Sequence, residues 1–260
     1  MIRGYFMKSF LSWVGGKSRL APAIIKQFPE HKTYVEVFGG AAWVLFRKEP
    51  SPVEVYNDID GDLVNLFRVV KHRPSALFER LNLILYSRET YKTFVEKWKE
   101  KPTDEIERAA LFIYSVKSSF GSNPGSGWGY GKMRKPSNII DLEFILKVQE
   151  RLKEVYIDGQ SCSKVITAFD SSDTVFYLDP PYWIPSQKFY KHEFNQEDHI
   201  ALRDRLATID GKFILSYNDS KEVRKLYRGF KVIATAPIHY SGNNKRTTAR
   251  MKRELIIKNF

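Results

Sequence analysis

The sequence predicts an α/β fold in which a Rossmann-like, doubly wound and mostly parallel sheet carries an inserted, mainly helical domain. Short apolar runs typical of buried strands alternate with segments of helical periodicity. The first apolar run leads into a glycine turn at residues 39–42, as in the first unit of nucleotide-binding sheets. A helical pattern at residues 61–150 interrupts the alternation, so we expect the sheet domain to comprise residues 1–60 and 151–260.

The composition indicates the kind of partner and excludes some kinds of site. The 260 residues include 42 Lys and Arg against 30 Asp and Glu, a net charge of +12 that favours a polyanionic partner, most often nucleic acid. A basic protein without such a partner is the alternative. A single cysteine, Cys162, excludes an internal disulfide and a zinc site of several cysteines. No apolar run could span a membrane and residues 1–13 lack the apolar stretch of a signal peptide, so we expect a cytoplasmic protein.

The N-terminal segment imitates a phosphate-binding loop without being one. Gly16-Lys17-Ser18 has the ending of that motif, but the motif needs a glycine at position 11, where this chain has leucine. A helix is expected over residues 21–28. Its N-terminal end would direct backbone N–H groups, together with Lys17, at an anionic group.

Two strands frame the glycine turn. Residues 34–38 and 53–56 have the pattern of buried strands, and the turn between them is expected to open a helix through residues 43–46. The second strand ends at Asp58. Because an acid about 20 residues after such a turn commonly holds the ribose hydroxyls of a nucleotide, the two features favour an adenosine-containing cofactor.

The inserted segment is expected to contain several helices, one of them capped by Thr103 and another over residues 139–152. Residues 118–136 break the helical pattern with glycines, aromatic residues and basic residues that include Lys132 and Arg134. A flexible, basic and aromatic loop favours contact with DNA, and an ordinary surface loop is the alternative.

A strand over residues 175–178 ends in Asp179-Pro180-Pro181-Tyr182. Proline fixes φ and has no N–H, so Asp179 and Pro180 are held extended and their carbonyls lack a local ladder donor. Such a strand end could accept hydrogen bonds from an amino group and stack a planar ring. An ordinary proline turn is the alternative.

The remaining elements continue the alternation. They are expected as a strand at 155–157, a helix capped by Asn195 and Asp198, a strand at 212–216, a helix at 221–227 and strands at 230–235 and 255–257. The loop between the last two strands carries Lys245, Arg246 and Arg250, which suit phosphate contact, with a solvated charge run as the alternative. Because ligands bind at the carboxyl ends of strands in such sheets, we expect the glycine turn, Asp58 and Asp179 to share one crevice.

Four short motifs occur in an order that resembles one enzyme family. They are WVGGK at residues 13–17, EVFGG at 36–40, NDI at 57–59 and DPPY at 179–182, with SGNN at 241–244 before a basic stretch. Over nearly the whole chain this order resembles the Dam family of DNA adenine-N6 methyltransferases. The resemblance implies a methyltransferase fold, S-adenosylmethionine as cofactor, double-stranded DNA as substrate, no metal, and target recognition by residues 61–150.

The resemblance also implies roles for individual residues. The cofactor would be surrounded by residues of the first three motifs and by the acid of the fourth, namely Trp13, Lys17, Glu36, Phe38, Gly40, Asp58 and Asp179. Asp58 would take the ribose hydroxyls. The target adenine would be flipped out of the duplex. Its amino hydrogens would lie on Asp179 and the Pro180 carbonyl and its ring on Tyr182, with Pro181 completing the catalytic motif.

Three positions depart from the family pattern. The glycine turn usually ends in a glycine where this chain has Ala42, which suggests a tighter turn or weaker cofactor binding. Members that recognise GATC commonly have a lysine where this chain has Ser12, and residues 115–130 lack their arginine- and asparagine-bearing pattern. The chemistry of the family is therefore expected here, whereas its target sequence is not.

Other functions stay open. The same scaffold could methylate cytosine N4 or RNA, although cytosine-amino enzymes more often carry serine in place of Asp179. Protein glutamine methylation would favour asparagine there. A catalytically silent DNA-binding protein is a further alternative, which a defective pocket at Ala42 would favour. We expect no membrane partner, a monomer or weak dimer associated with the nucleoid through DNA, and a cognate restriction endonuclease as a candidate partner.

Overall fold

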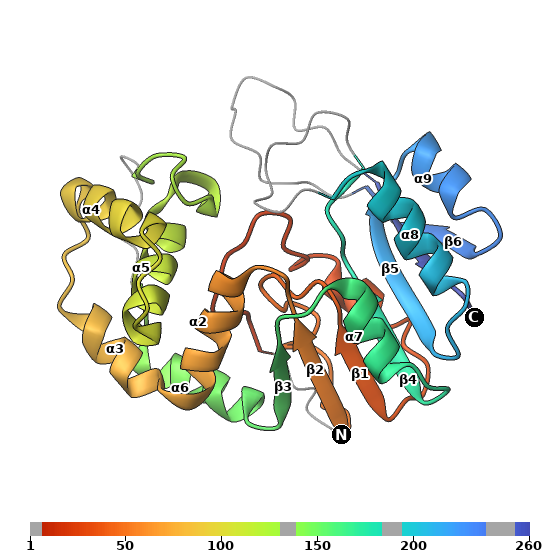
Figure 1. The fold of residues 1–260 in the computed structure, drawn as a ribbon, viewed down its shortest axis with the longest axis horizontal. Coiled ribbons are helices and arrows are strands. Elements are labelled where there is room, and N and C mark those ends of the chain that lie inside the picture. Colours follow the sequence, from red (N-terminus) through yellow and green to blue (C-terminus); the bar gives the residue numbers. More distant parts are fainter. Residues whose placement is uncertain (1–6, 131–138, 184–193, 238–252) are drawn as a thin grey trace.

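The computed structural model describes residues 7–130, 139–183, 194–237 and 253–260. In this part of the chain seven strands form one sheet in the order β3-β2-β1-β4-β5-β7-β6 (Figure 1). The strands are β1 (Thr33–Glu36), β2 (Val53–Asn57), β3 (Val155–Asp158), β4 (Thr174–Leu178), β5 (Lys212–Asn218), β6 (Lys231–Ala234) and β7 (Glu254–Lys258). The first five are parallel, whereas β7 runs antiparallel to both β5 and β6. The predicted mostly parallel sheet is confirmed.

The register of the central strands aligns their carboxyl ends. Glu36, the last residue of β1, lies opposite Tyr56 of β2 on one side and Tyr177 of β4 on the other. The segments that follow these three strands therefore leave the sheet at the same edge, which is where ligands bind in such folds.

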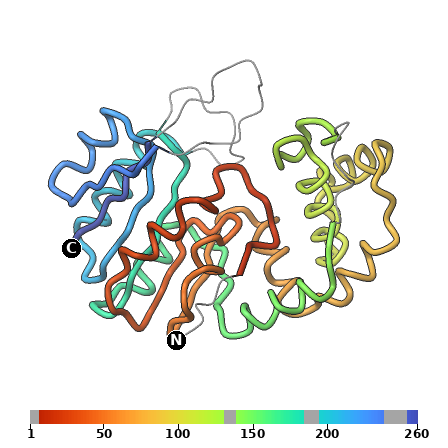
Figure 2. Tube along the Cα trace, turned by 180° about the vertical axis from the view of Figure 1, so that it is seen from behind, coloured from red at the N-terminus to blue at the C-terminus, as the bar shows by residue number. Residues whose placement is uncertain are grey.

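Helices cover both faces of the sheet (Figures 1 and 2). They are α1 (Ala21–Ile25) on one face and α7 (Cys162–Phe169), α8 (Gln196–Leu206) and α9 (Lys221–Leu226) on the other. Side chains of β1 alternate accordingly, because Tyr34 belongs to the core that includes α1 and Val35 to the core that includes α7 and α8. The sheet is therefore doubly wound, as predicted.

The helical insertion lies beyond the β3 edge of the sheet (Figure 1). It consists of α2 (Gly61–His72), α3 (Pro74–Asn82), α4 (Arg88–Lys99), α5 (Glu105–Ser118) and α6 (Leu142–Leu152), with a 3₁₀ turn at Phe120–Ser122. Its apolar side chains join the core that covers the α1 face of the sheet, so the insertion and the sheet share one hydrophobic core. None of the helices in the described part of the chain combines the length and apolar character of a membrane span.

Two local expectations are wrong, and one helix was not predicted. The turn at residues 39–42 does not open a helix, since residues 43–47 form turns and no helix lies among the described residues between β1 and β2. The cap of α5 is Asp104 rather than Thr103, since its side chain accepts a hydrogen bond from the Glu107 N–H at 2.7 Å. Helix α7 was not predicted, because its buried face contains only Val165 and Ile166.

Candidate active site

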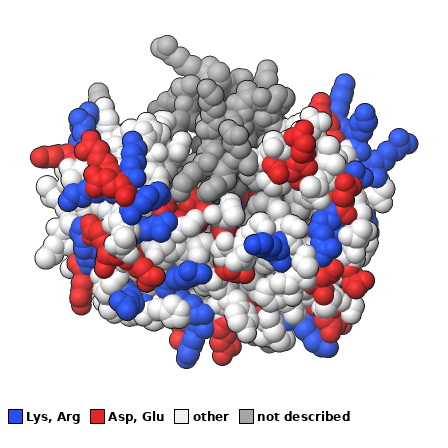
Figure 3. Space-filling view, in the orientation of Figure 1, with Lys and Arg blue, Asp and Glu red and all other residues white. Residues whose placement is uncertain are grey.

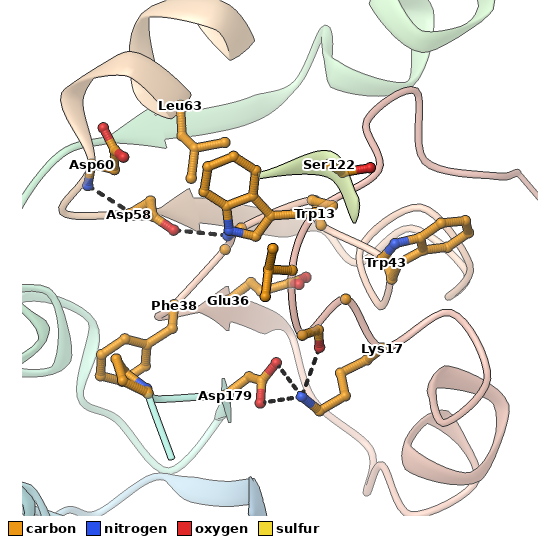
Figure 4. Close-up of a pocket in the computed structure, with 18 of the residues that line it drawn as sticks. Trp13, Lys17, Glu36, Phe38, Trp43, Asp58, Asp60, Leu63, Ser122 and Asp179 are labelled. Carbon is orange, nitrogen blue, oxygen red and sulfur yellow. Dashed lines mark hydrogen bonds and ion pairs between the residues drawn. The ribbon is translucent and has the colours of Figure 1, made fainter. Parts of the chain in front are cut away.

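A pocket of about 330 Å³ opens at the carboxyl edge of the sheet, between the ends of β1, β2 and β4 and the helical insertion. Figure 4 shows Asp58 and Asp60 at one end of it, Asp179 and Lys17 at the other, and Glu36 between the two ends. Most of the predicted cofactor and catalytic residues line it, namely Trp13, Lys17, Glu36, Phe38, Gly40, Asp58, Asp179 and Pro181. The crevice predicted from strand order is confirmed.

The glycine turn after β1 is shaped by Tyr56. A Cβ atom on Gly39 would lie 2.2 Å from the Cε2 atom of the Tyr56 ring, so a side chain cannot be accommodated there without displacing that ring. The Tyr56 hydroxyl donates a hydrogen bond to the Gly40 carbonyl at 2.9 Å. Ala42 follows with φ of 53°, in the left-handed region that costs a non-glycine residue about 1–2 kcal/mol.

Asp58 ties the end of β2 to this turn. Its Oδ2 atom accepts a hydrogen bond from the Gly40 N–H at 2.8 Å and its Oδ1 atom accepts one from the Asp60 N–H at 2.8 Å. Burial raises the pKa of Asp58 to about 6, and these hydrogen bonds oppose the rise. Each carboxylate oxygen has a second lone pair, so Asp58 can hold the turn and still accept hydrogen bonds from a ligand's hydroxyls.

Glu36 is a buried acid at the centre of the pocket. Its Oε2 atom accepts hydrogen bonds from the Tyr34 hydroxyl at 2.8 Å and the Leu45 N–H at 2.9 Å. Its other oxygen has no hydrogen-bond partner among the described residues and belongs to a side chain that lines the pocket. Burial raises the pKa of Glu36 to about 8. A cationic group of a ligand beside this carboxyl would stabilise its ionised form and take the place of its proton.

The wall opposite the sheet is apolar. Trp13 lies edge-on to Phe112 of α5, with ring centroids 5.8 Å apart, and Phe112 also contacts Trp98 of α4 at 5.7 Å. The Trp98 Nε1–H donates to buried Asp62 at 3.1 Å, which fixes the indole. The sequence analysis did not identify Leu63, Trp98 and Phe112 as residues that line the pocket.

Lys17 and Asp179 form a buried ion pair at the other end. The Lys17 ammonium lies 2.7 Å from each carboxylate oxygen of Asp179 and also donates to the Gly15 carbonyl at 3.0 Å. Ser216 of β5 donates a further hydrogen bond to Asp179 Oδ1 at 3.1 Å. Burial raises the pKa of Asp179, while the charge and hydrogen bond of Lys17 lower it.

Tyr182 lies beside this ion pair rather than in the pocket lining. Its hydroxyl donates to Glu254 at 2.7 Å, and its ring stacks on Tyr217 with centroids 5.8 Å apart. The Lys17 ammonium lies 4.8 Å from the ring centroid.

Pro180 is buried, and no hydrogen bond to its carbonyl is found among the described residues, so this oxygen can still accept one. Sequence reasoning missed Ser216 and Glu254.

The predicted DNA contacts lie outside the described residues, at Lys132, Arg134, Lys245, Arg246 and Arg250. On the face shown in Figure 3, Lys and Arg are interspersed with Asp and Glu, and basic side chains project from the end that carries α9. The described residues of this face therefore form no single continuous basic surface.

Comparisons with known proteins agree on one family. The sequence model of the D12 class N6 adenine-specific DNA methyltransferases matches residues 13–237. The chain is 28% identical to the Type II methyltransferase M1.LlaDCHI of Lactococcus lactis subsp. cremoris, over 98% of this chain and 96% of that protein. It is 28% identical to the Type II methyltransferase M.MjaIII of Methanocaldococcus jannaschii, over 98% and 99%. It is 27% identical to the DNA adenine methylase of Vibrio cholerae, over 85% of both.

Proposed function

Because the chain belongs to the family of D12 class N6 adenine-specific DNA methyltransferases, we propose that its pocket binds S-adenosylmethionine and that residues 179–182 hold a flipped-out adenine beside it. The enzyme transfers a methyl group to the N6 amino group of adenine in DNA. The observation that carries the assignment of the site is that Asp58, from the glycine-turn end, and Asp179, from the proline motif, line one pocket.

The residues of the pocket fit the proposed cofactor. Asp58 can accept hydrogen bonds from ribose hydroxyls, and the buried Glu36 carboxyl offers an ammonium group an oxygen that has no partner among the described residues. The apolar wall of Trp13, Phe38 and Phe112 suits a planar base, and Gly40 allows close approach to the backbone. When bound, S-adenosylmethionine supplies an electrophilic methyl group on a sulfonium.

The proline motif is proposed to orient the adenine amino group. Asp179, kept ionised by Lys17, accepts one amino hydrogen, and the Pro180 carbonyl accepts the other. With both hydrogens held, the lone pair of the nitrogen points in a fixed direction. Tyr182 packs on the base, and Pro181 fixes the backbone between them. This positioning supplies the acceleration, and flipping removes the base from the duplex, where its amino group is out of reach.

We also propose separate roles for different segments of the chain. Residues 1–60 and 151–260 form the catalytic domain, and residues 61–150 recognise the target in double-stranded DNA. Phosphate contacts come from the basic segments that contain Lys132 and Arg134, and Lys245, Arg246 and Arg250. The enzyme acts in the cytoplasm on nucleoid DNA, as a monomer or weak dimer, and a restriction endonuclease of the same specificity is a candidate partner.

Incubation of unmethylated DNA with radiolabelled S-adenosylmethionine tests the function. Mass spectrometry of the digested nucleosides should find the label in N6-methyladenine, and Asp179→Ala should abolish it while DNA affinity is retained. Label in N4-methylcytosine, in RNA or in protein would contradict the assignment, as would wild-type protein that binds DNA and transfers nothing.

A further inference from the structure

Glu254 is the first residue of β7 and lies beside the proline motif. Because β7 is antiparallel to β5, its first residue lies opposite Asn218, the last residue of β5. An antiparallel strand thus brings its beginning to the edge where the parallel strands end. By this route Glu254 reaches Tyr182, which precedes it by 72 residues in the chain.

The Glu254 carboxyl is almost fully buried, and only one of its two oxygens has a hydrogen-bond partner among the described residues. Its side chain belongs to a residue that is 1% exposed, and its Oε1 atom accepts the hydrogen bond of the Tyr182 hydroxyl at 2.7 Å. Its Oε2 atom is buried and has no hydrogen-bond partner among the described residues. Burial raises the pKa of Glu254, the charge of Lys17 lowers it, and the charge of Asp179 raises it.

Fold stability does not account for this acid. A buried carboxyl with an unsatisfied oxygen is costly, whereas an apolar residue of similar size would pack in the strand without that cost. The next three residues of β7 are Leu255, Ile256 and Ile257, all buried. An acid at the start of such a strand therefore indicates a role in the adjacent site.

The contacts of Tyr182 show what that role is. Tyr217 and the Lys17 ammonium contact its ring, at 5.8 and 4.8 Å, and both contacts allow the ring to slide or tilt. The hydrogen bond to Glu254 is the directional contact at the hydroxyl end. We propose that Glu254 is a positioning residue for methyl transfer, which holds the ring of Tyr182 at the angle at which a flipped adenine stacks on it. This inference rests on the stacking role proposed for Tyr182.

A fluorescent base in the DNA tests the proposal. Once the methylated sequence is mapped, a duplex is made with 2-aminopurine in place of the target adenine. Stacking on a fixed Tyr182 should quench the flipped base in the wild-type complex, and Glu254→Ala should make the complex brighter. Glu254→Gln keeps an acceptor oxygen and should restore the quenching. We expect kcat of Glu254→Ala to fall about tenfold or more through misplacement of the base, while DNA and cofactor affinities change less than about twofold.

Tyr182→Phe breaks the same hydrogen bond from the other side and should brighten the complex even if Glu254→Ala fails to fold. The loss of kcat in the double variant should not exceed that of Glu254→Ala alone, since both changes remove one interaction. Glu143→Gln, at an exposed position of α6, serves as control. Unchanged fluorescence in Tyr182→Phe, or additive losses of kcat, would overturn the proposal. Absence of methyl transfer by the wild-type protein would instead overturn the proposed function.

Discussion

The Nζ atom of Lys17 lies 2.7 Å from both carboxylate oxygens of Asp179, although 162 positions separate the two residues. The side chains are 4% and 18% exposed, so the pair is nearly shielded from solvent. Burial raises the pKa of Asp179, and the charge and hydrogen bond of Lys17 lower it, so Lys17 is the cation that favours the ionised form of this acid. The proposed role of Asp179 as a hydrogen-bond acceptor thus depends on Lys17 of the N-terminal motif.

Lys17→Met should therefore change the pH dependence of methyl transfer. Without the ammonium, the pKa of Asp179 rises further, so the acid limb of the kcat profile should move to higher pH. If the acid limb moves by one pH unit, kcat at a pH on that limb falls about tenfold. Part of the lost activity should return when the pH is raised. Steady-state kinetics between pH 6 and about 9 measure the shift.

Lys48→Met is the matched control for that variant. Lys48 is also a buried lysine, paired with Glu54, and it does not line the pocket. Breaking either buried pair should lower stability, less so in Lys48→Met because Arg151 still pairs with Glu54. Loss of stability alone is therefore common to both variants. An acid limb that stays in place in Lys17→Met, or moves equally in Lys48→Met, would contradict the role of Lys17.

Glu36 should make cofactor binding depend on pH. Burial raises its pKa to about 8, above the unfolded value of about 4.3, so the free folded protein holds a proton at Glu36 near neutral pH. The folded state binds more protons than the unfolded state between these two values. Stability therefore falls as pH rises through that window.

A cationic cofactor favours the ionised form of Glu36, so binding should release a proton and affinity should rise with pH, by at most about tenfold per unit. Asp58, with a pKa of about 6, adds to this dependence at lower pH. Calorimetry at pH 6.5–7.5, about one unit below Glu36, in buffers of different ionisation enthalpy measures the released proton. In Glu36→Gln the release at pH 7 should disappear. Equal proton release in the variant would assign the titration to another group.

The sequence was informative where a site depends on the ends of parallel strands. Asp58 and Asp179 follow β2 and β4 directly, so strand order alone placed them in one crevice. The sequence did not predict that Glu254 lies beside Tyr182. This contact arises because β7, an antiparallel strand, inserts between β5 and β6. The sequence also failed for Phe112, since an aromatic residue on a helix has the same pattern whether it faces a core or a pocket.

The backbone of the glycine turn is a second case, because sequence pattern predicted the turn but not its φ angles. Ala42 has φ of 53° and is 1% exposed. Ala42→Gly should relieve about 1–2 kcal/mol of left-handed strain, partly offset by the greater freedom of glycine in the unfolded chain. We expect a net gain of about 0.5 kcal/mol in the free energy of unfolding in urea and unchanged or tighter cofactor binding.

Ala41→Gly is the control for this change, because Ala41 is also buried, at 3% exposure, and is not among the residues with positive φ. Glycine there adds only flexibility and should lower the free energy of unfolding by about 0.5–1 kcal/mol. Opposite signs at two adjacent alanines would identify strain as the cause. Destabilisation by both changes would show that the turn gains nothing from glycine at residue 42.

DNA affinity should depend on salt through the basic segment near the last strand. Lys245 and Arg246 lie outside the described residues, but the chain resumes at Arg253 and Glu254, beside Tyr182. Replacing both by glutamine should reduce the slope of log affinity against log salt by about two, because each lost phosphate contact releases about one counterion fewer. Fluorescence anisotropy at several salt concentrations measures the slope.

Lys147→Gln with Lys153→Gln removes the same charge from the exposed surface of α6 and its end, where both lysines face acidic neighbours and neither lines the pocket. If Lys245 and Arg246 contact phosphates, only their replacement lowers the slope, because net charge alone acts weakly beyond a Debye length of about 8–10 Å. Equal changes in both double variants would mean that the protein's overall charge, rather than this segment, attracts DNA. An unchanged slope in the Lys245 and Arg246 variant would place the phosphate contacts on another face.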